Sequence, residues 1–321
     1  MPENVVNRSA QTPSGNQFSP ESPETARCEW LQTSDGVQHF TRAWLAGQSG
    51  PVCFYLHGIE GHSRWFEETA LALNERGISV YALDRRGAGA SKEHRGHIGD
   101  YRRMVKDVEE LIEVVRSRHP GSAVVLVGNC WGAKVAVTVA AQAQKTGTVQ
   151  ALVLTSPAVA VQVDVTPMTK LQIGLNFLFG TKKYFDIPLT PEHFTDNPIY
   201  LEYIASDRLR LKQATASFFV NSLMLTRACK RAGRLLSMPV LVLQSGRDEI
   251  VRVQSIKQWF DTISSSDKTL KIFTSAAHSL DFDAAAPEYQ QTLSNWITDR
   301  VKQLRAADSE PSNKNRSRLQ P

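Results

Sequence analysis

The chain has 321 residues, of which 41% are hydrophobic, and a formal net charge of +5 at pH 7. This length suits one large α/β domain with an insertion, and the apolar fraction is sufficient for a sizeable core. The positive charge is neither gathered into a block nor interleaved with aromatic residues, so the sequence gives no indication of nucleic-acid binding.

The four cysteines, at positions 28, 53, 130 and 229, are widely separated and form no Cys-x-x-Cys pair. This spacing predicts neither a zinc site nor a disulfide framework, and reduced thiols are typical of a cytoplasmic protein. Residues 1–26 are polar and lack the apolar core of a signal peptide, so we expect a disordered lead there. No stretch approaches the roughly 20 apolar residues of a membrane-spanning helix, while peripheral membrane contact stays open.

The elements predicted from Cys28 onward alternate between strands and helices. They are an opening hairpin around 34–36, a buried strand ending at 57–58, a helix at 65–76, a strand from 78, a helix at 101–117, a strand at 124–127, a helix from 133 and a strand at 151–157. Alternation at this spacing predicts an α/β fold, with a mostly parallel sheet and helices on both faces.

The strand pattern stops at Pro157 and resumes at Pro239. Residues 158–237 contain no further clear strand but include helix-like segments at 169–179 and 216–236. We therefore expect a helical cap at 158–237, inserted into a core formed by 27–157 and 238–305. A polar tail at 306–321 is expected to be disordered.

The segment Gly128-Asn129-Cys130-Trp131-Gly132 lies between a predicted strand and a predicted helix. In this pattern a strained turn presents the central side chain above the sheet, and small flanking residues let the helix pack close to the strand. The positive N-terminus of the helix favours a thiolate. Buried cysteines are often only small core residues, but the surrounding pattern favours a catalytic Cys130.

Two later strand ends supply a base and an acid. His278 follows the last predicted strand and Asp248 follows the strand before it, in the chain order nucleophile, acid, histidine. We expect His278 to take the proton of Cys130 and Asp248 to orient His278. Three other carboxylates near them in the sequence compete for this role: Glu249, Asp281 and Asp283.

A tetrahedral intermediate needs backbone N–H donors for its oxyanion. Trp131, directly after the cysteine, and Ile59, directly after a His-Gly pair, are the expected donors. The alternative for the segment around Ile59 is a simple glycine-rich turn. The segment 84–91, which begins with Asp84, is expected to brace the site rather than to take part in catalysis.

Five ordered motifs, at 55–66, 84–91, 128–133, 246–251 and 276–280, together resemble the α/β-hydrolase superfamily. Within it, they are similar to the monoacylglycerol-lipase-like or serine-aminopeptidase-like branch, and the resemblance runs from about 28 to 305, including the cap. It implies the α/β-hydrolase fold, with Cys130 as nucleophile, Asp248 as acid, His278 as base, and Ile59 and Trp131 as oxyanion donors. It implies no cofactor and no metal.

Most members of this branch have serine where this chain has Cys130, and a serine replaced by engineering stays an alternative. A thiolate forms more readily near neutral pH than an alkoxide and is the better leaving group, which favours thioesters and activated esters or lactones. We expect a hydrolase of a small, lipid-like acyl substrate with an acyl-thioester intermediate. An acyltransferase using the same intermediate and an inactive hydrolase-fold binding protein are the alternatives.

The apolar residues of the two predicted cap helices have two possible uses. They could line an acyl pocket, or they could only pack the cap onto the sheet domain. The sequence leaves both open.

Overall fold

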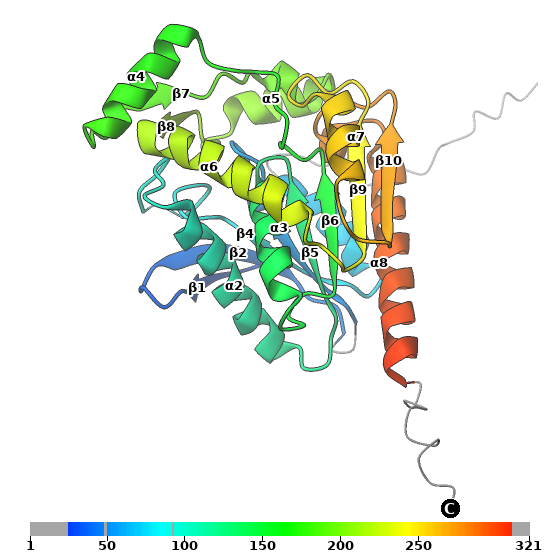
Figure 1. Cartoon of the computed structure of the whole chain (residues 1–321). Coiled ribbons are helices and arrows are strands. Elements are labelled where there is room, and N and C mark those ends of the chain that lie inside the picture. The colour runs from blue at the N-terminus through cyan, green and yellow to red at the C-terminus, as the bar shows by residue number, and fades with distance from the viewer. Residues whose placement is uncertain (1–24, 48–49, 92, 310–321) are drawn as a thin grey trace, which may run out of the picture.

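The computed structural model describes residues 25–47, 50–91 and 93–309 (Figure 1). Its main feature is an eight-stranded sheet in the order β1-β2-β4-β3-β5-β6-β9-β10, in which only the pairs β1–β2 and β2–β4 are antiparallel. The strands are β1 Arg27–Gln32, β2 Gln38–Trp44, β3 Val52–Leu56, β4 Ser79–Leu83, β5 Val124–Asn129, β6 Ala151–Thr155, β9 Val240–Ser245 and β10 Lys268–Phe273. The sheet confirms the predicted mostly parallel α/β architecture.

The central strands are apolar because both faces of the sheet are covered. Every residue of β3, β4, β6 and β9 is buried. The outer strand β10 is only partly buried. The carboxyl ends of the parallel strands therefore meet at one edge of a rigid layer.

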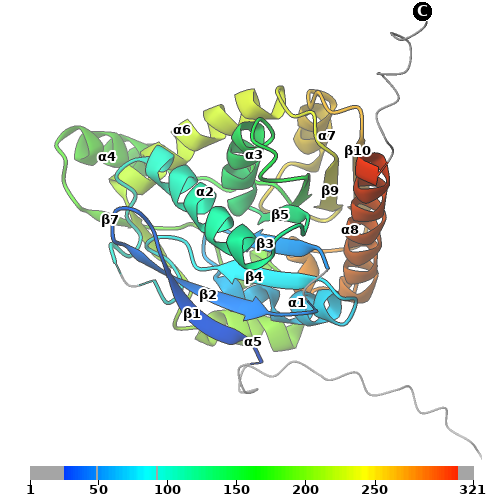
Figure 2. The same ribbon diagram turned by 90° about the horizontal axis from the view of Figure 1, so that it is seen from below.

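Five helices cover the sheet, two on one face and three on the other (Figure 2). Helices α1 (Glu67–Asn74) and α8 (Ala286–Ser309) pack on one face, and α2 (Tyr101–Arg118), α3 (Gly132–Ala143) and α7 (Val253–Asp261) pack on the other. The apolar residues that recur at helical spacing in α2 are all buried: Met104, Val108, Leu111, Ile112 and Val115. Helical periodicity therefore identified the packed face correctly.

The segment between β6 and β9, which we call the cap, contains three helices and two short strands. They are α4 (Pro167–Leu178), β7 (Tyr184–Asp186), α5 (Pro198–Ser206), β8 (Gln213–Thr215) and α6 (Ala216–Gly233). The expectation of no strand here is wrong, because β7 and β8 pair antiparallel. Each has three residues, which is too short for an alternating pattern to be recognised. Helix α6 packs on α3, while α4 extends away from the sheet (Figure 1).

The two predicted terminal segments differ from the structure at their inner ends. Within the expected lead at 1–26, Thr25 is described, and its hydroxyl donates to Glu67 at 2.7 Å. The tail predicted from 306 begins too early, because α8 continues to Ser309. The rest of both calls, at 1–24 and 310–321, lies outside the described residues. None of the described helices is both long and apolar enough to cross a membrane.

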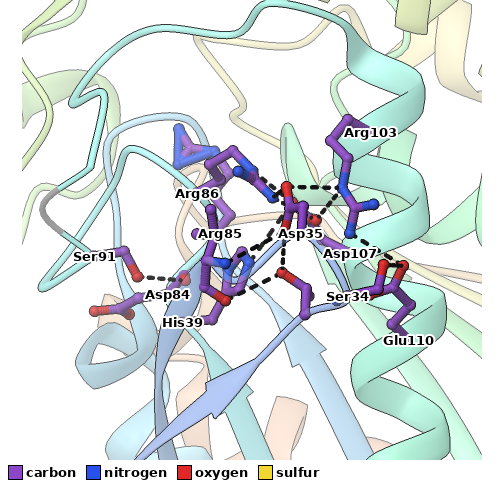
Figure 3. Close-up of polar contacts among 12 residues, drawn as sticks. Ser34, Asp35, His39, Asp84, Arg85, Arg86, Ser91, Arg103, Asp107 and Glu110 are labelled. Atoms are coloured by element: carbon purple, nitrogen blue, oxygen red, sulfur yellow. Dashed lines mark hydrogen bonds and ion pairs between the residues drawn. The ribbon is translucent and has the colours of Figure 1, made fainter.

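A group of charges around the buried carboxylate of Asp107 joins the β1–β2 hairpin to α2 (Figure 3). The carboxylate of Asp107 accepts from Nε and Nη2 of Arg86 at 2.8 and 2.7 Å, and from Nε of Arg103 at 2.8 Å. Arg86 also donates to Asp35, in the hairpin turn, at 2.8 Å. We call these four residues the Asp107 cluster. The opposite charges of the cluster neutralise one another.

Candidate active site

Cys130 occupies the turn between β5 and α3. Its φ angle is +48°, in the left-handed region that a side chain with a Cβ atom rarely adopts. The turn is held by its backbone: the N–H of Cys130 donates to the carbonyl of Thr155 at 2.9 Å, and its carbonyl accepts from the N–H of Ala158 at 2.9 Å. Such strain persists where the surrounding structure imposes it, often at functional sites.

The two glycines beside Cys130 are required by close packing. A Cβ atom at Gly128 would lie 2.6 Å from the Cβ of Ala136, and one at Gly132 would lie 2.4 Å from the carbonyl oxygen of Leu56. Both distances are shorter than any non-bonded contact of a real Cβ atom. The structure therefore gives the physical reason for the glycine spacing found in the sequence.

His278 and Asp248 form a buried pair at the ends of β10 and β9. Nδ1 of His278 lies 2.8 Å from both carboxylate oxygens of Asp248. Oδ2 of Asp248 also accepts from Nε2 of Gln244 at 2.9 Å, and Oδ1 accepts from the backbone N–H groups of Ile250 and Val251 at 2.9 and 2.8 Å. Because a carboxylate can only accept, Nδ1 of His278 carries a proton. The other ring nitrogen, Nε2, is then available for chemistry.

The environment of His278 favours its charged form. Burial opposes protonation, but the charges and hydrogen-bonding groups of Asp248 and Cys130 outweigh burial and raise the pKa of His278 to about 10. Nε2 makes no hydrogen bond of regular geometry with any described residue. Cys130 is thus near enough to raise the pKa of His278, although its sulfur and Nε2 do not form a hydrogen bond of regular geometry. Long or poorly aligned hydrogen bonds are common in active sites that hold no substrate.

The competing carboxylates do not contact His278. Glu249 is exposed. Asp281 accepts from the hydroxyl of Thr69 at 2.6 Å, and Asp283 accepts backbone N–H groups within its own loop. The structure therefore brings Asp248, and none of these three, to the histidine.

The loop that carries Ile59 lies directly against the turn between β5 and α3 that carries Cys130. A Cβ atom at the preceding Gly58 would be 3.3 Å from the Cβ of Cys130. Within the described ranges, the N–H groups of Ile59 and Trp131 donate to no backbone carbonyl. Both residues line the same cavity as Cys130. Their free N–H groups are the feature that an oxyanion site requires.

Arg85 ties these two residues together, a role that the sequence analysis missed. Its Nη2 donates to the carbonyl of Ile59 at 2.5 Å, and its guanidinium lies 5.0 Å from the ring centre of Trp131. Nε and Nη1 have no partner within the described part of the chain. Burial lowers the pKa of Arg85 to about 9. The cation is costly to bury, and it supports the backbone of Ile59.

Asp84 connects two loops, in agreement with its predicted bracing role. Oδ1 accepts from the N–H of Ser63 at 2.6 Å, and Oδ2 accepts from the N–H of Ala90 at 2.7 Å. Asp84 is completely buried and does not line either cavity next to Cys130. Through these two hydrogen bonds, Asp84 holds the loop at 84–91 next to the loop that contains Ser63.

Two cavities of very different size meet at Cys130. The larger, of about 530 Å³, is lined mainly by apolar side chains, among them Ile173 of α4 and Phe219 and Leu223 of α6. The smaller, of about 10 Å³, is lined by Tyr55, His57, Asn129, Ser279 and Asp281 among others. Helix α6 of the cap packs on α3 and also lines the larger cavity, while the use of that cavity as an acyl pocket stays a prediction.

Lys134 is a second residue that the sequence analysis missed. It lies one turn beyond Cys130 on α3, lines the larger cavity and is 5% exposed. The only available signal was a single charge in the otherwise apolar helix at 133–141. No group of three or more His, Cys, Asp or Glu side chains in the described residues could hold a metal ion.

Comparison with known proteins gives consistent matches. A family model described as serine aminopeptidase, S33, matches residues 47–285. Human monoglyceride lipase is 26% identical over 279 residues, which are 84% of this chain and 90% of that protein.

Two solved structures extend the likeness to the fold. A soluble variant of monoglyceride lipase from Saccharomyces cerevisiae, in complex with a substrate analogue, has a TM-score of 0.78 at 15% identity, covering 88% of this chain and 97% of that one. Monoacylglycerol lipase from Paleococcus ferrophilus has a TM-score of 0.72 at 20% identity, covering 82% and 99%. These structures confirm the predicted α/β-hydrolase fold.

Proposed function

Because the chain belongs to the serine aminopeptidase S33 family, we propose that it hydrolyses carboxylic esters or thioesters with Cys130 as nucleophile. The observation that carries this proposal is the pair of His278 and Asp248, with a spacing of 2.8 Å, beside a cysteine that opens onto an apolar cavity. The names of the relatives, which are monoglyceride lipases, support an acyl substrate with a lipid-like chain.

The first half of the reaction forms an acyl-enzyme. The thiolate of Cys130 attacks the carbonyl carbon and forms a C–S bond, while the carbonyl electrons move to oxygen. The N–H groups of Ile59 and Trp131 stabilise this oxyanion. When the intermediate collapses, the bond to the leaving alkoxide or thiolate breaks, and His278 gives that group the proton on Nε2.

The second half releases the acid. Neutral His278 now takes a proton from water as the water oxygen attacks the thioester carbonyl. Collapse of this second intermediate breaks the C–S bond and expels the Cys130 thiolate. The products are a carboxylic acid and the starting pair of thiolate and imidazolium. Asp248 stays ionised and holds the ring in position.

The choice of acceptor follows from the smaller cavity. With a volume of about 10 Å³, it has room for about one water molecule next to Cys130. This favours hydrolysis over transfer to a larger acceptor. No disulfide joins the four cysteines, all of which lie in the described part of the chain, and the cytoplasmic location inferred from them stays a prediction.

The direct test follows acyl transfer to the sulfur. The protein is incubated with p-nitrophenyl esters and acyl thioesters, and both product release and intact mass are measured. We expect repeated turnover in water, a transient acyl adduct on Cys130, and loss of both in Cys130→Ala. Cys53→Ala is the matched control, because burial raises the pKa of that thiol and keeps it neutral.

The outcomes separate the alternatives. An adduct that only added amines or alcohols discharge would support an acyltransferase instead. Turnover that survives in Cys130→Ala would exclude the cysteine as nucleophile. If no acyl donor gives either an adduct or turnover, the result would support the alternative that the chain is an inactive binding protein.

A second test addresses the ion pair. Since the pKa of His278 is raised to about 10, the histidine stays protonated through neutral pH. A positive charge beside a sulfur favours its thiolate form. We expect the rate of Cys130 alkylation by iodoacetamide to be nearly constant from about pH 6 to 9. In His278→Ala, the rate should rise with pH as for an ordinary thiol. A wild-type rate that rises in the same way would contradict the ion pair.

A further inference from the structure

Lys134 brings a positive charge to the wall of the larger cavity. The cavity is also lined by Cys130, Trp131 and Ser222. Lys134 lies in the first turn of α3, which begins two residues after Cys130, and both residues line this cavity. The amine is therefore on the wall of the space that an acyl group on the sulfur would enter.

The amine has almost no compensation for its burial. Within the described ranges it forms no ion pair, and its one hydrogen bond is to Oγ of Ser222 at a long 3.4 Å. That oxygen already accepts from Nε1 of Trp131 at 2.8 Å, so the Ser222 proton is free to donate. The site thus presents an ammonium and a hydroxyl as donors, with no acidic partner.

Burial lowers the pKa of Lys134 to about 8, despite the opposing charges of Cys130 and Cys229, and Lys230 adds to the lowering. The amine therefore still carries its charge at neutral pH. An unpaired buried cation destabilises a protein, and an apolar side chain would fill the same space without this cost.

The other charged residues of the cavity wall are different. Asp164 and Lys170 pair with each other, and their side chains are 60% and 54% exposed. Among the described lining residues, Lys134 is the one buried lysine or arginine, and no carboxylate pairs with it. The rest of the wall is mainly apolar. A ligand that complements this cavity is therefore an apolar chain that carries one negative charge.

We propose that Lys134, with Ser222, binds a carboxylate on the acyl group of the substrate, so that the preferred substrates are half-esters or half-thioesters of dicarboxylic acids. This inference rests on the proposed function, since it names the substrate class of the same site. A carboxylate fits better than a phosphate, because one ammonium matches one negative charge. The position of Lys134 in the first turn of α3 favours a chain of few carbons between the two carboxyl groups.

The experiment compares matched acyl chains. p-Nitrophenyl esters with a terminal carboxylate are measured against esters of equal length with a terminal methyl group, over a series of chain lengths. For wild type we expect kcat/KM to favour the carboxylate by roughly 10- to 100-fold at one chain length. Lys134→Met should abolish this preference, and Ser222→Ala should reduce it. The preference is a ratio, so a general change in rate does not affect it.

Lys170→Met is the matched control, because it removes a lysine from the exposed part of the same wall. It should keep the preference. A wild-type preference for the methyl series at every length, or a carboxylate preference that survives in Lys134→Met, would overturn the inference.

A binding measurement separates this inference from the catalytic proposal. Calorimetric titration of Cys130→Ala with the free dicarboxylates needs no turnover. We expect binding that weakens at least about 10-fold when Lys134→Met is added. Binding without turnover in wild type would reject the catalytic proposal and keep the anion site. Turnover of neutral esters without binding of dicarboxylates would keep the catalytic proposal and reject the anion site. Tighter binding of alkyl phosphates than of dicarboxylates would reject a carboxylate as the group that Lys134 binds.

Discussion

Arg85 and Arg86 are neighbours in the chain, but Arg86 is paired with carboxylates and Arg85 is not. Arg86 joins the Asp107 cluster, where Asp107 and Asp35 provide carboxylates for it at 2.7 and 2.8 Å (Figure 3). Arg85 turns inward, where it bonds a carbonyl and lies over the ring of Trp131. Lys134, on the other side of the elbow, is also buried without a carboxylate partner in the described residues.

The difference separates charges that stabilise the fold from charges that serve the site. In the Asp107 cluster the opposite charges meet within the protein, so removing one leaves the others uncompensated. Around Cys130 the cations are incompletely paired, which costs stability. In the function that we propose, these cations act on the site and on a bound acyl group instead of on the fold. Mutations in the two regions should therefore affect different measurements.

The largest expected effect is on stability. Asp107→Ala should lower the free energy of unfolding by about 3–5 kcal/mol, because it leaves Arg86 and Arg103 without their shared buried partner. Urea denaturation measures this change. The control is Asp196→Ala, which removes an exposed pair with Arg247 and should cost less than about 1 kcal/mol. Equal costs for the two variants would show that burial of the cluster is unimportant.

The next effect is on catalysis. Arg85→Met should lower kcat by roughly 10- to 100-fold, about 1.4–2.8 kcal/mol in activation free energy, because the carbonyl of Ile59 loses its support and its N–H moves. KM should change little, and Arg85→Lys should recover part of kcat. A fall in unfolding free energy with unchanged kcat would instead make Arg85 a purely structural residue.

A smaller effect with the opposite sign is expected at Lys134. Lys134→Met should raise the free energy of unfolding at pH 7 by about 1 kcal/mol, since it removes an unpaired buried charge. The pKa of Lys134 is about 8 in the folded protein and higher in the unfolded chain. The unfolded chain therefore holds the proton more tightly, and the penalty is full below pH 8 and fades as pH rises above it.

Thermal or urea unfolding of both proteins from pH 7 to 10 gives the comparison. The stability gap between Lys134→Met and wild type should close with increasing pH. A variant less stable than wild type at pH 7 would mean that Lys134 is satisfied inside the fold.

The smallest effect is expected at the exposed side of the Asp107 cluster. Burial acts to raise the pKa of Asp35, but hydrogen bonds from Thr33 and Arg86 and the charge of Arg86 lower it to about 2. Its contribution is present above about pH 4 and is lost as pH falls toward 2. Asp35→Asn should thus cost less than about 1 kcal/mol at pH 7, and this difference should shrink in acid. A difference that persists at pH 2 would point to packing instead of charge.

Much of the fold was predictable because its signals are local. The apolar runs of β3 to β6 and the turn around Cys130 each carry a pattern of their own. The chain order of Cys130, Asp248 and His278 then pointed to one edge of the sheet. The expected pairing of Asp248 with His278 agrees with the observed contacts, while the roles of both stay proposals.

The rest depended on tertiary packing. The sequence Arg85-Arg86 offers two identical side chains, and nothing local decides which one turns inward. A lysine at 134 is compatible with an exposed helix face until α6 covers it. The strands β7 and β8 are each only three residues long, and they pair with each other although they lie 27 or more positions apart in the sequence. These features arise from contacts between distant segments, which periodicity does not record.

The place where the cap enters the sheet has one more consequence. The chain leaves at the end of β6 and returns at β9, and these two strands are neighbours paired in parallel, with Leu152 beside Val240. Because the two strands are parallel, the chain leaves at the carboxyl end of β6 and returns at the amino end of β9, at the opposite edge of the sheet. The last cap helix, α6, packs on α3 before the chain returns. An exchange of cap sequences between relatives must therefore keep the packing of α6 on α3, whereas α4, which extends away from the sheet, is the part that can vary.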